Sequence, residues 1–179
     1  METLKFNRVL AITVMILVIA AAIPCGVIRS VNALERKVEK IYDAGNERNG
    51  TVRTDLTRLA DYGQNLYALA EPLGCADAAF AEAVTVLRGT IGSPITDGGA
   101  TTALMSAASL AYNRIMALPE ITESQKNSAV LYFYEMDSTR ARLQNNEQYA
   151  AAARKYNRAI ESFPASLLCG GKEPAITFK

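Results

Sequence analysis

The chain has 179 residues, a net charge of +1, and no His or Trp. Its Lys and Arg residues are scattered among Asp and Glu, so no basic stripe points to nucleic acid. The absence of His excludes Ser-His and Cys-His nucleophiles, His-ligated zinc and the Glu-x-x-His di-iron site. We therefore expect no catalytic residue, no metal site and no cofactor.

A stretch without any charge runs from Val9 to Ile28 and ends at Arg29. Twenty helical residues span about 30 Å, which is the thickness of the hydrocarbon core of a bilayer. The sequence therefore predicts a transmembrane helix over residues 9–28, preceded by a short tail over residues 1–8.

The same stretch shares features with a cleavable signal peptide. Lys5 and Arg8 precede it, and Ala20 to Ala22 provide the small residues of a cleavage site. However, the stretch is longer than the usual signal-peptide core of about 7–15 residues, and an amphipathic helix follows it directly. We favour an anchor that is retained.

The orientation of this anchor follows from the cations beside it. Two cations precede the stretch, whereas four follow it within the range that decides topology: Arg29, Arg36, Lys37 and Lys40. The amino terminus adds one charge to the short side. The balance favours a body on the cytoplasmic side.

Apolar residues at alternating steps of three and four continue beyond Arg29, and this spacing predicts an amphipathic helix. Asn46 to Gly50 should end this helix, with Gly50 as the stop. The seam residues are Val31, Leu34, Val38, Ile41 and Gly45.

The second segment keeps the same spacing from Val52 to Leu87, which is typical of near-parallel, coiled-coil-like helix packing. Pro72 and Gly74 interrupt the backbone but not the register. We interpret this as a kink in one long helix, with a short break between two helices as the alternative. Asp77 is expected to cap a helix after the interruption.

The remaining chain predicts a loop and two further helices. Residues 89–99 are rich in Gly and lack a phosphate-binding motif. A third helix is expected over residues 101–118 and ends before Pro119. Thr122 and Gln125 resemble a capping box at the start of a fourth helix over residues 122–162.

These segments predict an all-α fold, in which the transmembrane helix continues into an antiparallel four-helix bundle over residues 29–164. Residues 165–179 form a C-terminal tail. Tyr149, Tyr156 and Phe163 recur every seven residues, so we expect them in the core, with a ligand-stacking surface as the alternative. Asn146 and Asn157 are expected as buried residues that fix helix register, with ligand binding as the alternative.

The three Cys residues show no metal-binding or redox spacing. Cys25 lies inside the apolar stretch. Cys75 and Cys169 are expected as unpaired thiols, and a disulfide between them would require an oxidising compartment.

The end of the fourth predicted helix resembles the bacterial LemA family. The family closes its bundle with Tyr-Asn pairs at seven-residue spacing and an Ile-x-Ser-Phe-Pro-like ending. The matching residues here are Tyr149, Tyr156, Asn157, Ile160, Ser162, Phe163 and Pro164. Leu118-Pro119-Glu120 is similar to a turn of the family. Ala150 departs from its first Tyr-Asn pair, so the chain resembles a divergent member.

The resemblance implies a single-pass protein of the bacterial inner membrane with a helical bundle in the cytoplasm. The family has no assigned catalytic residues, and one branch is linked to building magnetosome membranes.

Two functions from different classes follow. The first is a non-enzymatic scaffold that associates with the bilayer, with copies of itself or with other membrane proteins, and shapes the membrane or organises a complex there. The alternative is a membrane-tethered sensor that binds a small ligand between its helices, near residues 89–99 and Pro72, and acts through a separate partner.

Overall fold

The computed structural model describes residues 2–44, 51–95 and 99–178, with the backbone alone for residues 2–7 and 9. Seven helices and no strands occur in these ranges. The predicted all-α class is confirmed. Gly45, the Asn46–Gly50 helix stop and part of the predicted 89–99 loop lie outside the described residues.

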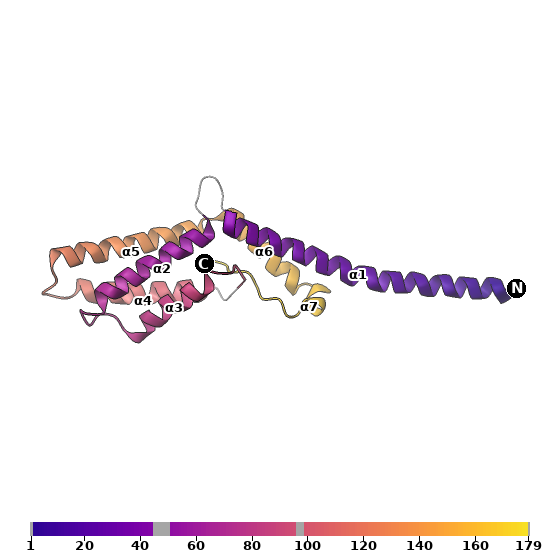
Figure 1. Cartoon of the computed structure of the whole chain (residues 1–179), viewed down its shortest axis with the longest axis horizontal. Coiled ribbons are helices and arrows are strands. Elements are labelled where there is room, and N and C mark those ends of the chain that lie inside the picture. The colour runs from indigo at the N-terminus through magenta and orange to yellow at the C-terminus, as the bar shows by residue number, and fades with distance from the viewer. Residues whose placement is uncertain (1, 45–50, 96–98, 179) are drawn as a thin grey trace.

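Helix α1 (Glu2–Ala44) is a single helix that passes through Pro24 without ending. Its 43 residues correspond to a rod of about 65 Å. The apolar part projects from the body (Figure 1), and its large side chains between Leu10 and Ile28 are exposed except for the half-buried Val27. Within the described residues, α1 is the one helix long and apolar enough to cross a membrane.

The remaining helices pack in two groups, which we call lobes (Figure 1). The distal lobe consists of α2 (Val52–Ala70), α3 (Ala78–Thr90), α4 (Gly99–Met116) and α5 (Glu123–Gln144), whose chain directions alternate. The proximal lobe consists of the second half of α1, α6 (Glu147–Glu161), α7 (Ala165–Leu168) and the tail over residues 169–178.

The expected kink at Pro72 is wrong, because the chain breaks there and turns back. Helix α2 ends at Ala70, and Gly74 takes the left-handed conformation with φ of 66°. Gly tolerates this conformation because it has no Cβ. The Asp77 carboxylate then accepts a hydrogen bond from the Phe80 amide at 3.1 Å, so its predicted capping role is confirmed.

The single helix expected over residues 122–162 is also wrong. Helix α5 ends at Gln144, and α6 begins at Glu147 after two consecutive Asn residues. The Asn146 side chain accepts a hydrogen bond from the Tyr149 amide at 3.0 Å. Short polar side chains of this kind compete with helical backbone bonds, so Asn146 starts a new helix instead of fixing register inside one.

Most predicted seam residues lie in the core. Val31 and Val38 are buried, as are these residues of the predicted seam from Val52 to Leu87: Val52, Leu56, Leu59, Gly63, Leu66, Ala70, Phe80, Val84 and Leu87. The later helices contribute Leu104, Ala108, Ala111, Ile115 and Met136 to the same core. The predicted capping box of Thr122 and Gln125 is confirmed. Phe163 is the clear exception, because 81% of it is exposed.

Candidate functional site

The two lobes meet at a set of contacts that we call the joint: Tyr42, Arg53, Tyr149, residues 91–94 and residues 175–178. The fully buried Tyr42, in the last turns of α1, donates a hydrogen bond from its hydroxyl to the Ile91 carbonyl at 2.8 Å. Ile91 directly follows α3. Tyr42 therefore connects α1 to the end of α3 in the distal lobe.

Arg53 completes this connection from the first turn of α2. Its guanidinium bonds the Asp43 carboxylate at 3.0 Å and the Gly92 carbonyl at 3.2 Å. It also lies 5.7 Å from the centre of the Tyr42 ring. The cation–π contact and the two polar bonds tie α1, α2 and the α3–α4 connection together.

Tyr149 of α6 packs beside Tyr42, with their ring centres 6.1 Å apart, and against Phe178 of the tail at 5.7 Å. Its core position is confirmed, since only 1% of it is exposed. Within the described residues, its buried hydroxyl has no hydrogen-bond partner. An unpaired buried hydroxyl is unfavourable, so the packing of three rings holds Tyr149 here against that cost.

Burial raises the pKa values of Tyr42 and Tyr149, the two tyrosines of the joint. It raises the pKa of Tyr42 to about 12; Arg53 partly opposes this shift, and Asp43 adds to it. Burial, with the neighbouring Tyr42, also raises the pKa of Tyr149. Both rings are therefore neutral at physiological pH and act as packing and hydrogen-bonding groups.

The second predicted pair, Tyr156 and Asn157, holds the C-terminal tail. The buried Tyr156 donates its hydroxyl to the Glu173 carbonyl at 3.2 Å. Asn157 donates to the Ala175 carbonyl at 3.0 Å and accepts from the Ala175 amide at 2.7 Å. The register-fixing role expected for Asn157 is wrong, because its amide satisfies the backbone of an extended tail.

The tail continues from Asn157 into the joint. The Ile176 amide donates to the Pro94 carbonyl at 2.9 Å, and Ala175 and Ile176 are each 4% exposed. From the sequence, residues 165–179 were predicted only as a C-terminal tail. The only local signal was the apolar content of Ala175, Ile176 and Phe178, which is too short to predict docking.

The other predicted motif residues lie away from the joint. Ile160 is buried, Ser162 donates its hydroxyl to the Ala159 carbonyl at 2.9 Å, and Pro164 precedes α7. Phe163 points into solvent, and its predicted core position is wrong. Of the motif residues, Tyr156 and Asn157 thus hold the tail, whereas Phe163 lies in an exposed turn.

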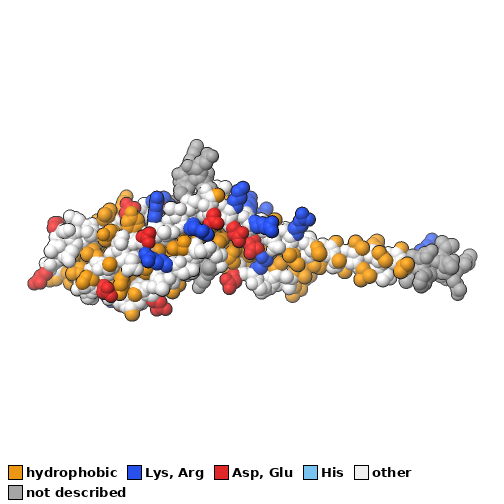
Figure 2. Space-filling view, viewed as in Figure 1, with side chains coloured by type: hydrophobic (Ala, Val, Ile, Leu, Met, Phe, Trp, Pro, Cys, Tyr) orange, Lys and Arg blue, Asp and Glu red, His pale blue; other side chains and the backbone are white. Residues whose placement is uncertain are grey.

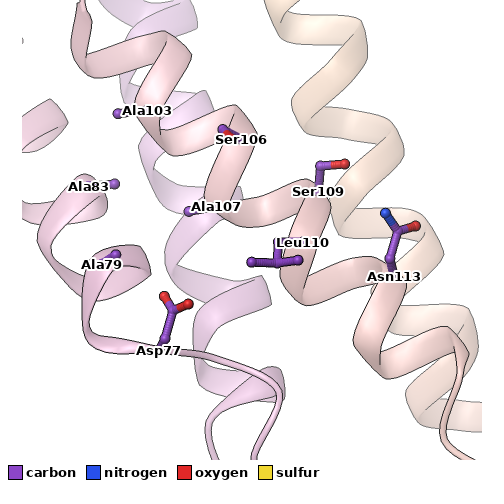
Figure 3. Close-up of a pocket in the computed structure, with 9 residues that line it drawn as sticks. All are labelled: Asp77, Ala79, Ala83, Ala103, Ser106, Ala107, Ser109, Leu110 and Asn113. Atoms are coloured by element: carbon purple, nitrogen blue, oxygen red, sulfur yellow. The ribbon is translucent and has the colours of Figure 1, made fainter.

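A cleft of about 630 Å³ lies between α3 and α4 in the distal lobe (Figure 3). Small side chains line most of it: Ala79, Ala83, Ala103, Ser106, Ala107 and Ser109. Asp77 lies at one end, where its second carboxylate oxygen is 3.6 Å from Arg114. The cleft is an open surface groove beside the Pro72 break, and it offers apolar contact more than charged groups.

No cluster of metal-ligating side chains occurs among the residues that the structure describes. Cys75 and Cys169 are free and buried, one after α2 in the distal lobe and one after α7 in the proximal lobe. Cys25 is exposed on the apolar part of α1.

No family model, curated protein or solved structure matches this chain.

Proposed function

We propose that the chain is a non-enzymatic, single-pass membrane scaffold that holds a helical body rigidly at the bilayer surface. The observation that carries this proposal is the continuity of α1. Its first half is apolar and exposed, whereas Val31, Val38 and Tyr42 of its second half are at most 2% exposed inside the proximal lobe. Lipid is the medium that suits the first half.

The joint supports the scaffold role because it extends this rigidity to the distal lobe. Tyr42 and Arg53 bond the α3–α4 connection, and the tail bonds the same connection at Pro94. In our proposal, α2 to α5 act as an antiparallel bundle whose position relative to the membrane is set by these contacts.

The place of this scaffold is part of the proposal. We infer a divergent LemA-like protein of a bacterial inner membrane, with the body in the cytoplasm. The excess of cations after the apolar stretch favours this side. The docking of the tail on Tyr156 and Asn157 gives the family-like residues a structural role consistent with it.

Labelling with an impermeant thiol reagent in intact cells tests on which side of the membrane the body lies. Native Cys75 and Cys169 are buried, so an exposed reporter such as Glu82→Cys on α3 is required, in a Cys25→Ser background. We expect labelling only after the cells are opened. Labelling of intact cells would place the body outside and contradict the proposal.

Association with a second copy is proposed through the α3–α4 cleft, because its small side chains allow close helix approach. Ser106→Cys in the Cys25→Ser background should form a cross-linked dimer in membranes. Asn65→Cys, exposed on α2, is the matched control and should stay monomeric. A monomeric Ser106→Cys protein that is also monomeric when sized in detergent would exclude self-assembly.

The sensor alternative is favoured by one observation, namely that this cleft lies beside the Pro72 break. A small uncharged metabolite bound there would raise the melting temperature of the extracted protein. Ala107→Leu would fill the cleft and abolish that shift. A shift that survives Ala107→Leu would place the ligand elsewhere.

A further inference from the structure

Two large apolar side chains outside the apolar stretch of α1 are left almost fully in solvent. Phe163 is 81% exposed and Leu167 is 77% exposed, more than any other large hydrophobic residue described. Phe163 lies in the turn between α6 and α7, Leu167 lies in α7, and Leu168 beside it is 38% exposed. We call residues 162–168 the corner. It carries no charge. Exposed apolar groups that cluster in this way mark a contact surface.

The position of the corner along α1 follows from the packing of α6. Helix α6 packs on α1 and runs antiparallel to it (Figure 1). Burial raises the pKa of Tyr156, and the nearby Glu35 and Glu39 of α1 add to this shift. Helix α6 ends at Glu161, five residues and about 8 Å along its axis beyond Tyr156, and the corner follows directly. The same distance back along α1 from Glu35 leads to Ser30, two residues after the apolar stretch ends.

Three further contacts place the corner at this level. Helix α7 packs on α1, and Val27, a residue of the apolar stretch, packs against the core of the body. Lys172, four residues after α7, forms an ion pair with Glu35. In Figure 2, hydrophobic side chains gather at the lower edge of the proximal lobe, next to the start of the free part of α1.

We propose that the corner is a second membrane contact, in which Phe163, Leu167 and Leu168 enter the boundary between headgroups and acyl chains beside α1. This inference rests on the proposed function, since it requires α1 to span the bilayer. The corner is continuous with that lipid-facing stretch, and the exposed Arg29 marks the headgroup level there. A lone transmembrane helix leaves its rotation and tilt free, whereas a second contact fixes them.

The absence of Trp from the chain allows a direct test with single Trp variants. Phe163→Trp and Leu167→Trp keep an exposed apolar side chain and do not disturb the core. The full-length variants are placed in phosphatidylcholine vesicles whose acyl chains are brominated near the headgroup. We expect about a twofold loss of Trp emission relative to unbrominated vesicles, because the contact lies within the shallow boundary.

Two matched variants make the outcome decisive. Tyr134→Trp, at the most exposed large hydrophobic residue described in the distal lobe, should show no loss of emission. Val18→Trp, in the middle of the apolar stretch, reports whether α1 itself lies in the bilayer when the acyl chains are brominated near their ends. Loss at Val18 without loss at Phe163 and Leu167 would overturn the corner contact and leave the anchor intact. No loss at any site would overturn both. Equal loss at Tyr134 would show that the lipid contact is not specific to the corner, which would overturn the inference.

Discussion

The two lobes are stabilised in different ways. The distal lobe joins four consecutive helices through apolar seams, and its helical connections are short. The proximal lobe joins segments from opposite ends of the chain, such as Tyr42 with Tyr149 and Glu35 with Lys172. Contacts distant in sequence carry a larger loop-closure cost. The proximal lobe therefore depends on both chain ends, whereas we expect the distal lobe to form from residues 51–144.

The largest expected effect separates the lobes by breaking α6. Ala153 is fully buried in mid-helix, and Pro there removes a backbone hydrogen bond and clashes with the preceding turn. We expect Ala153→Pro to cost about 3 kcal/mol or more and to unfold the proximal lobe only. Circular dichroism should show partial loss of helix, with the melting transition of the distal lobe retained.

Glu147→Pro is the matched control for that variant. Glu147 is the first residue of α6, and its amide donates at 2.9 Å to the Asn145 carbonyl, which lies outside the helix. Pro at this position therefore removes one local bond and no bond within α6. Complete unfolding of Ala153→Pro would contradict the separate stability of the two lobes. Equal losses of helix in Ala153→Pro and Glu147→Pro would contradict it as well.

A second variant probes the distal lobe through an ion pair between a buried Asp and a half-buried Arg. Arg142 of α5 lies 3.3 Å from the Asp55 carboxylate of α2, whose side chain is 5% exposed. Arg142→Leu leaves this charge without its partner, at an expected cost of about 3 kcal/mol in chemical unfolding. Arg88→Leu removes an exposed pair with Asp61 and should cost less than about 1 kcal/mol. If Arg142→Leu and Arg88→Leu lowered the free energy of unfolding by similar amounts, burial would not decide the strength of these ion pairs.

Alkaline pH should weaken the proximal lobe first. The pKa of Tyr42 is raised from 10.0 to about 12, so the folded state keeps a proton that the unfolded state releases. The stabilisation is complete below pH 10 and is lost as the pH rises towards 12, by on the order of 2 kcal/mol for this group. In Tyr42→Phe, the free energy of unfolding measured in urea should fall less steeply with pH over this range. An unchanged slope of that free energy against pH would show that Tyr42 does not cause the dependence.

The smallest expected effect distinguishes the two hydroxyls of the joint. Tyr149→Phe removes a buried hydroxyl without a described partner and should stabilise the protein by about 1 kcal/mol. Tyr42→Phe loses the bond to Ile91 and should destabilise it by about the same amount. Opposite shifts in melting temperature are expected, and shifts of the same sign would contradict this assignment.

Local patterns predicted much of the fold. The seam from Val52 to Leu87 identified the core of α2 and α3, and the Thr122 capping box identified the start of α5. Periodicity did not reveal the breaks, because Pro72 and Asn145–Asn146 interrupt the backbone while the seam residues keep their spacing. A break and a kink leave the same residue spacing in the sequence, and they differ only in the direction in which the next helix runs.

The joint was less accessible from the sequence. Tyr149 and Tyr156 were predicted as core residues, but their partners lie in α1, in residues 91–94 and in the tail. No pattern in a single sequence connects Asn157 with the backbone of Ala175. Phe163 shared the seven-residue spacing of the tyrosines and was misplaced for that reason, since α6 ends two residues before it.

The most direct test of the central claim is the intact mass of the chain recovered from high-salt-washed membranes of expressing cells. A retained anchor predicts the chain of 179 residues in the membrane fraction, with its apolar stretch complete. A soluble product that begins after Ala22 would show that the stretch is a cleaved signal, and would contradict a body held at the bilayer by α1.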